Sequence, residues 1–89
     1  MALYKIEWKR SATKELRSLP SKAIKKILAT VEELTTNPHP IASIKLSGTE
    51  HTYRIRTGEY RIVYNMLDQV LVIAVIRVGH RKDVYRHLS

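Results

Sequence analysis

The sequence predicts an α+β fold in which a two-helix hairpin packs on one face of a small, mostly antiparallel sheet. Two observations predict this class. Residues 11–34 repeat apolar side chains at helical spacing, and residues 52–78 contain three strand-like segments separated by short turns. The 89 residues contain no linker and no internal repeat, so residues 1–89 are expected to form a single domain with the order β-α-α-β-β-β.

The first elements are a strand and two helices. Residues 3–8 alternate well enough to predict the strand. Ser11 is suited to cap a short helix, and Pro20 separates it from a second helix, which Ser21 is suited to cap and the run NPHP at 37–40 ends. The apolar positions have amphipathic spacing in both helices, at Ala12, Leu16 and Leu19 in the first and at Ala23, Ile24, Ile27, Leu28, Val31 and Leu34 in the second.

The strands follow the helices. Residues 44–46 are a candidate for one short strand, and residues 52–56 and 60–67 predict a hairpin. Residues 70–78 are the most apolar segment and are therefore expected to lie centrally in the sheet. The basic segment 81–88 is expected to form one or two helical turns.

The first hairpin brings arginines together. A two-residue turn at 57–58 would place Arg54 directly opposite Arg61 and would leave Glu59 opposite Arg56, on the face away from the helices. Like charges that face each other across a sheet lower stability, and such a conflict often marks a functional site. Arginine also binds phosphate through two parallel hydrogen bonds. The arginines therefore favour an anion-binding face over a merely solvated strand face.

The second hairpin predicts what lies beside the arginines. A turn at 68–69 would pair Arg61 with Ile76 and Val63 with Ala74. The face that carries the arginines is then expected to hold small apolar side chains next to them.

The net charge of the chain indicates which classes of partner it binds. A net charge of +8 and a pI near 10.1 point to a polyanion, a membrane surface or an acidic protein partner. The longest apolar run, residues 70–76, is far too short to span a bilayer, and the N-terminus shows no signal peptide. The absence of cysteine excludes disulfides and thiolate metal sites and fits a cytoplasmic protein.

The histidines do not indicate a metal site. None of His39, His51, His80 and His87 forms a pair with convincing metal-ligand spacing, so no metal and no cofactor are expected. His80 follows the last strand and is either a general acid or base or an exposed turn residue. Tyr85 in the basic tail is suited to stack on a nucleobase.

Three spaced segments carry a resemblance to a known family. They read KLSG at 45–48, YRIRTGEYRIVY at 53–64 and VIRVGHRKDVY at 75–85. In this order, in a small basic chain with a helical hairpin before them, they resemble the RelE family of bacterial and archaeal toxins, within the RelE/ParE toxin–antitoxin superfamily. The resemblance covers nearly the whole chain.

The resemblance implies a toxin of a type II toxin–antitoxin system. Such a toxin is a metal-independent endoribonuclease, an mRNA interferase that cuts mRNA in the A site of the 30S ribosomal subunit by attack of the RNA 2′-OH and so inhibits translation. A cognate acidic antitoxin, similar to RelB, would hold it inactive in a toxin–antitoxin complex in the cytoplasm.

The resemblance also implies roles for individual residues. The family's two basic residues in the first hairpin strand fall on Arg54 and Arg56, its second-strand arginine on Arg61, its post-strand arginine on Arg81 and its C-terminal tyrosine on Tyr85. The best-known members have lysines at the first two positions, and arginine is a poor general base, so the proton acceptor stays open. Arg56, Arg61, Arg81 and Tyr85 are expected to be catalytic, and Lys45, Arg54, His80 and Lys82 to bind RNA.

Two other functions remain open at this stage. A ParE-like inhibitor of DNA gyrase would share the fold and need no RNA chemistry. A non-catalytic domain that binds RNA or the ribosome would keep the basic face without cutting.

Overall fold

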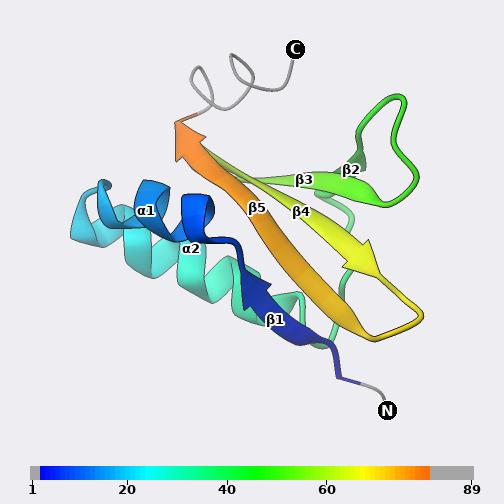
Figure 1. Ribbon diagram of the computed structural model, residues 1–89. Helices are drawn as coiled ribbons and strands as arrows, with labels where there is room; N and C mark the ends of the chain where they lie inside the picture. Colours follow the sequence, from blue (N-terminus) through cyan, green and yellow to red (C-terminus); the bar gives the residue numbers. More distant parts are fainter. Residues whose placement is uncertain (1–2, 81–89) are drawn as a thin grey trace.

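The computed structural model describes residues 3–80, which form a five-stranded sheet with two helices against one face (Figure 1). The predicted α+β class and helical hairpin are confirmed, whereas the expected helical segment at 81–88 lies outside the described residues. No helix in the described part of the chain is long and apolar enough to cross a bilayer. The elements are β1 (Lys5–Trp8), α1 (Arg10–Arg17), α2 (Ser21–Glu33), β2 (Ile44–Lys45), β3 (Thr52–Thr57), β4 (Tyr60–Leu67) and β5 (Val72–His80).

The strands lie in the order β1-β5-β4-β3-β2. β1 pairs with β5 in parallel, and every other neighbouring pair is antiparallel. The expectation that the most apolar segment is central was therefore slightly wrong, because β4 is the middle strand. β5 is nevertheless an interior strand between β1 and β4, which explains its nearly continuous apolar sequence.

Both helices begin without the expected serine caps. Lys9 and Pro20 occupy the N-cap positions, and neither makes a side-chain capping bond. The backbone N–H of Lys9 donates to the carbonyl of Val75 at 3.0 Å, so the chain continues its pairing with β5 until the helix starts. Ser11 and Ser21 consequently lie within the first helical turns rather than before them.

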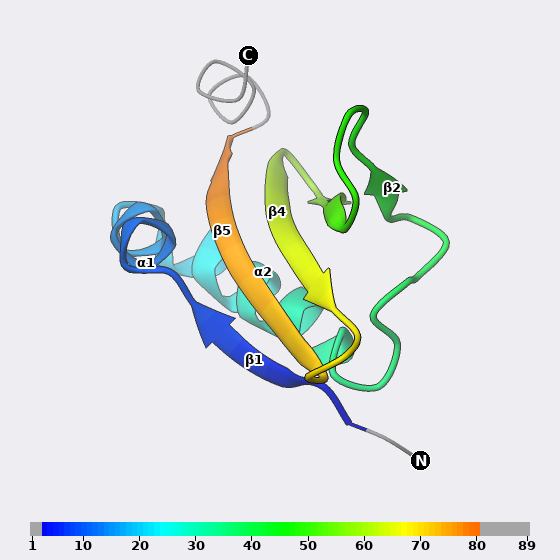
Figure 2. The same ribbon diagram turned by 45° about the vertical axis from the view of Figure 1, so that its right-hand side comes forward.

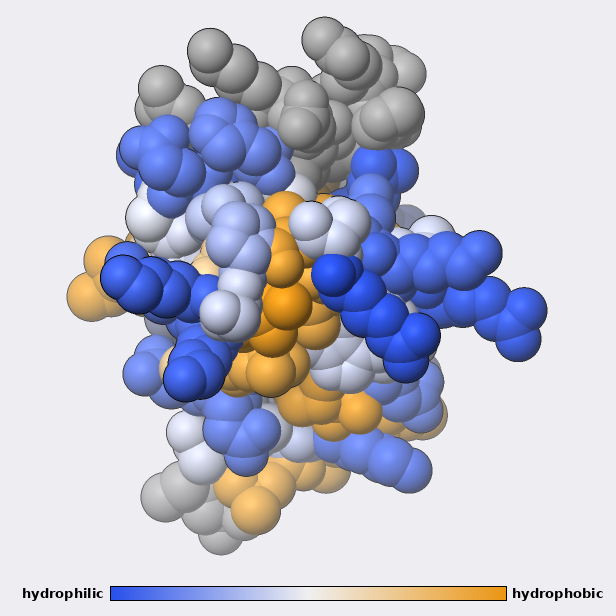
Figure 3. Space-filling view, turned by 90° about the vertical axis from the view of Figure 1, so that its left-hand side faces the viewer, coloured by the Kyte–Doolittle hydropathy of each residue, from blue (hydrophilic) through white to orange (hydrophobic). Residues whose placement is uncertain are grey.

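The two helices cover the same face at different places (Figure 2). α2 lies behind the sheet, against β3 and β4, whereas α1 lies beside β5 at the end where β1 has stopped. Seen from the helix side, apolar surface runs between hydrophilic side chains (Figure 3). Leu28 of α2, expected to be part of the buried stripe, is 45% exposed.

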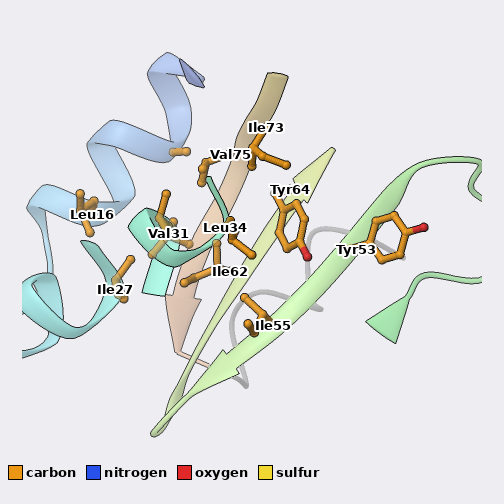
Figure 4. Packing of buried hydrophobic residues seen from close by; sticks show 12 residues of the cluster. Leu16, Ile27, Val31, Leu34, Tyr53, Ile55, Ile62, Tyr64, Ile73 and Val75 are labelled. Atoms are coloured by element: carbon orange, nitrogen blue, oxygen red, sulfur yellow. The ribbon is translucent and has the colours of Figure 1, made fainter. Parts of the chain in front are cut away.

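The hydrophobic core lies between the helices and this face of the sheet (Figure 4). Tyr64 at its centre is fully buried, and its hydroxyl donates to the carbonyl of Pro38 at 2.9 Å, which ties the segment after α2 to the sheet. Burial raises the pKa of Tyr64, because the phenolate would be less well solvated than the phenol. The core side chains include Leu16, Ile27, Val31, Leu34, Tyr53, Ile55, Ile62, Tyr64, Ile73 and Val75.

Candidate nucleic-acid interface

The register of the first hairpin differs from the expected one by two residues. Thr57 pairs with Tyr60, so the turn is formed by Gly58 and Glu59, and Arg56 rather than Arg54 lies opposite Arg61. Gly58 has a φ of +61° at the first central position of the turn, where a type II′ hairpin needs glycine. The expected pairing of Arg54 with Arg61, and of Glu59 with Arg56, was therefore wrong.

A shift by two residues leaves every side chain on its expected face. Ile55 still pairs with Ile62 in the core, and the arginines remain together on the opposite face of the sheet. We call this opposite face the arginine face. It consists of Arg54, Arg56, Arg61 and Arg77, together with Val63, Ala74 and Gly79.

The second hairpin adds an arginine that the sequence analysis missed. Four residues, 68–71, connect β4 to β5, and Leu67 pairs with Val72. A β-bulge between Val63 and Tyr64 then shifts the register, so that Val63 lies opposite Arg77.

Two expected cross-strand pairs are wrong as a consequence. Arg61 pairs with Gly79 rather than Ile76, and Val63 pairs with Arg77 rather than Ala74. The sequence signal for a further site residue was the single arginine within the apolar run of β5. The two-residue turn assumed at 68–69 hid that signal.

The arginines lie at different depths. Arg56 is exposed, Arg54 is half-buried and only 8% of Arg61 is exposed. A guanidinium stays protonated in proteins, so each of them is a fixed positive charge. The charge of Arg61 is the most shielded from water, and an anion bound beside it would therefore feel a lower dielectric than at the surface. Depth and charge together suit this face to a phosphate.

Arg77 forms an ion pair with Glu15 of α1, in the helix layer. Glu15 of α1 places its Oε2 at 2.8 Å from the Nη2 of Arg77, while its Oε1 accepts a hydrogen bond of 3.0 Å from the backbone N–H of Val78. Both side chains are about one-quarter exposed, at 24% for Arg77 and 27% for Glu15. The carboxylate of Glu15 therefore binds two successive residues of β5, Arg77 through its side chain and Val78 through its backbone N–H.

Two predicted residues do not lie on the arginine face. Lys45 pairs with Tyr53, which faces the core side, so the side chain of Lys45 lies on that side too. His80 pairs with Tyr60, and their ring centroids are 6.0 Å apart. The Nε2 of His80 lies 3.6 Å from the carboxylate of Glu59, an ion pair only when the imidazole is protonated.

Three other predicted site residues, Arg81, Lys82 and Tyr85, lie outside the described residues. Within residues 3–80, no three histidine, aspartate or glutamate side chains are grouped as metal ligands would be.

Comparison with known proteins identifies the family. Residues 6–85 match the sequence model of the family described as the ParE toxin of the type II toxin–antitoxin system parDE. The mRNA interferase toxin RelE of Escherichia coli K12 is 34% identical over 86 residues, which cover 92% of this chain and 90% of that protein. The chain belongs to the RelE family of the RelE/ParE superfamily. It is thus a RelE-type toxin of a type II toxin–antitoxin system.

Solved structures of RelE toxins have the same fold. The toxin–antitoxin complex RelBE2 from Mycobacterium tuberculosis matches with a TM-score of 0.81 at 25% identity, covering 93% of this chain and 97% of that one. The archaeal RelE–RelB complex from Pyrococcus horikoshii OT3 matches with a TM-score of 0.80 at 29% identity, covering 91% and 98%. The five-stranded sheet with two helices is therefore the RelE fold.

Proposed function

We propose that this RelE-type toxin is an endoribonuclease that cuts mRNA in the ribosomal A site and so stops translation. The observation that carries the proposal is the pairing of Arg56 with Arg61 on the sheet face away from the helices, with Arg54 on the same strand as Arg56. Two guanidiniums side by side concentrate positive charge and offer parallel hydrogen bonds, which suits an RNA phosphate. The E. coli relative named an mRNA interferase supports the same activity.

The proposed chemistry is an internal transesterification. The RNA 2′-oxygen forms a bond to the adjacent phosphorus, the bond to the 5′-oxygen breaks, and the products are a 2′,3′-cyclic phosphate and a 5′-hydroxyl. The 2′-hydroxyl loses its proton, and the leaving 5′-oxygen gains one. The nucleophile is part of the substrate, so positioning alone supplies much of the rate. Arg56 and Arg61 stabilise the negative charge that builds up on the phosphate oxygens.

The remaining residues serve binding and proton transfer in this proposal. Arg54 and Lys82 bind flanking phosphates, Arg81 assists the leaving 5′-oxygen, and Tyr85 stacks on the nucleotide at the cut. Arginines do not accept the 2′-proton at neutral pH. A site with such weak acid–base groups gains most of its rate from the alignment of the RNA. We therefore expect cleavage to depend on the ribosome, which holds the mRNA in place.

The partner that restrains the toxin is an acidic antitoxin in this proposal. Both matching structures described above are complexes of a toxin with its antitoxin, and the net charge of +8 favours an acidic polypeptide that folds on binding. The apolar surface between hydrophilic side chains on the helix side suits an amphipathic segment (Figure 3). The exposed Leu28 belongs to the same helix layer. Binding there would cover the helices.

DNA gyrase is the alternative target. The matching family model is described as the ParE toxin, and a ParE-like toxin would inhibit gyrase. A gyrase inhibitor has no need for a cluster of phosphate-binding arginines, so the arginine face favours the nuclease. Supercoiling by gyrase in the presence of the purified chain distinguishes the two targets, since the proposal predicts no inhibition.

The proposal is tested by primer extension on a defined mRNA in ribosomes with an empty A site. The wild-type chain should produce new ends within the A-site codon and none on ribosome-free RNA. Arg56→Met should lower the cleavage rate by at least tenfold, because one fixed charge at the phosphate is lost. Lys25→Met is the matched control, since it removes an exposed charge from the helix layer and should cut normally. Absence of cleavage by a folded wild-type chain would refute the proposal.

A further inference from the structure

We propose that Arg77 is a further RNA-binding residue of the arginine face and that Glu15 is the residue that positions it. This inference rests on the proposed function and deepens it, because it extends the site by one phosphate position and names the element that orients it. Three observations support the inference: the β-bulge in the second hairpin, the point at which β1 stops pairing with β5, and the contacts of the Glu15 carboxylate.

The bulge places Arg77 in a row with another arginine. Arg54 pairs with Val63, and Val63 pairs with Arg77, so the two arginines lie on either side of a fully buried valine on three adjacent strands. The next row along the sheet holds Arg56, Arg61 and Gly79. Strands are about 4.8 Å apart, so Arg77 lies roughly 10 Å from Arg54 across the face. RNA crossing the sheet would meet positive charge on all three strands.

The end of β1 explains why Glu15 is needed. β1 pairs with β5 only as far as Val75, and the chain then turns into α1. Among residues 3–80, no strand pairs with the outer edge of β5 beyond this point, and Glu15 instead accepts the N–H of Val78 at 3.0 Å. Its other oxygen binds the Nη2 of Arg77. Glu15 of α1 thereby accepts a backbone hydrogen bond that a neighbouring strand would otherwise accept, and it orients the guanidinium of Arg77.

Glu15 leaves donors of Arg77 for a ligand. A guanidinium carries five N–H donors, and the carboxylate of Glu15 engages Nη2. The Nε of Arg77 is buried and unpartnered, so the donors left for an anion are those of the Nη groups, on a side chain that is 24% exposed. An arginine held by a carboxylate loses less side-chain entropy when it binds phosphate, because its planar group is already oriented.

A purely structural role is the competing explanation. The ion pair would then only fasten α1 to the sheet, and its loss would affect stability but not RNA binding. The two explanations differ in the salt dependence of RNA affinity, since each phosphate contact to single-stranded RNA contributes about −0.7 to the log–log slope. A structural clamp contributes nothing to that slope.

The test is fluorescence anisotropy of a labelled single-stranded RNA with the full chain across a salt series, with thermal melting to verify folding. Arg77→Met should weaken binding by about tenfold and make the slope shallower by about 0.7, as Arg56→Met should. Lys25→Met, which changes the net charge equally, should leave the slope unchanged. Arg77→Lys keeps the charge and should keep the slope, which shows that the change in Arg77→Met comes from the lost charge. If Arg77→Met fails to fold, Arg77→Gln removes the same charge with a polar side chain and should show the same shallower slope.

Glu15→Gln tests the positioning role. The amide oxygen can still accept the Val78 N–H, but the ion pair with Arg77 is lost. We expect RNA to bind at least as tightly, because a negative charge is removed, while kcat for ribosomal cleavage falls about tenfold and KM does not rise. An unchanged kcat would overturn the positioning role.

Two other outcomes would overturn the inference in distinguishable ways. If Arg77→Met, or Arg77→Gln in its place, keeps the wild-type slope while Arg56→Met loses part of it, Arg77 is only a clamp and the proposed function stands. If the wild-type chain neither binds RNA with salt dependence nor cuts it on ribosomes, both the proposed function and the inference fail.

Discussion

Replacing Arg56 by threonine should stabilise the fold while it lowers the proposed nuclease activity. Arg56 lies directly opposite Arg61, so the two like charges repel each other across the strands. Threonine suits an exposed strand position and removes one of the two charges. The same pair that serves the proposed chemistry should therefore reduce stability.

The size of the effect follows from the geometry. With roughly 6 Å between the two guanidinium charges, the repulsion in water is about 0.7 kcal/mol. Screening at 0.1 M salt reduces it to about 0.4 kcal/mol, since the Debye length there is about 10 Å. The burial of Arg61 lowers the local dielectric and raises the value again. We expect about 0.5 kcal/mol, or a rise in Tm of roughly 2–4 °C for a domain of this size.

The matched control is Arg54→Thr. It removes the same charge from the same strand, but Arg54 lies opposite Val63 and so should gain clearly less stability. Thermal unfolding of both variants and the wild type in low salt and in 1 M NaCl measures the difference, which should vanish at high salt. An equal or larger gain for Arg54→Thr at low salt would refute the register and the reasoning built on it.

Three further predictions concern stability away from the arginine face. Leu71 has a φ of +54°, in the left-handed region that favours glycine. Leu71→Gly should therefore raise the free energy of unfolding in urea by about 0.5 kcal/mol, because the relieved backbone strain exceeds the added entropy of the unfolded chain. A lower free energy of unfolding would contradict this. Tyr64→Phe leaves the carbonyl of Pro38 without its donor and should cost about 1–2 kcal/mol in the same assay, whereas a neutral result would mean that water replaces the hydroxyl. The hydrogen bond to Asp68 raises the pKa of Tyr4 above its ordinary value of 10.0, so the folded state keeps a proton that the unfolded state releases. Stability from this group is therefore complete below pH 10 and lost as the pH rises through the folded pKa, and urea unfolding between pH 8 and 11 should show a shallower alkaline loss for Tyr4→Phe than for wild type.

The sequence was sufficient for both helices, for the hairpin strands and for the faces of the sheet. The expected order β-α-α-β-β-β lacked one strand, because the candidate segment at 44–46 forms β2. Helical spacing located α1 and α2 because both bury a continuous apolar stripe, and strand alternation separated Ile55 and Ile62 from Arg56 and Arg61. A two-residue error in register does not change which face a side chain occupies, so Arg54, Arg56 and Arg61 were placed on the correct face despite the wrong pairs, whereas Arg77 was missed.

The missing details depended on tertiary contacts. The position of Gly58 within its turn was readable in principle, because glycine at the first central position is typical of type II′ hairpins. The bulge that moves Arg77 beside Val63 has no comparable signal in one sequence. The contact of Glu15 with Arg77 requires knowing that α1 lies along β5, which neither segment encodes alone. Lys45 and His80 were misplaced because their strand partners, Tyr53 and Tyr60, were not known.

The most direct test of the proposed function uses two mRNAs that differ by one oxygen atom. Each carries the same codon in the A site of a stalled ribosome, and one has 2′-deoxyribose on the 5′ side of the scissile phosphate. Transesterification predicts that the purified chain cuts the all-ribose mRNA to a 2′,3′-cyclic phosphate and a 5′-hydroxyl, and leaves the deoxy mRNA intact. Equal cleavage of both mRNAs, or cleavage of neither, would contradict it.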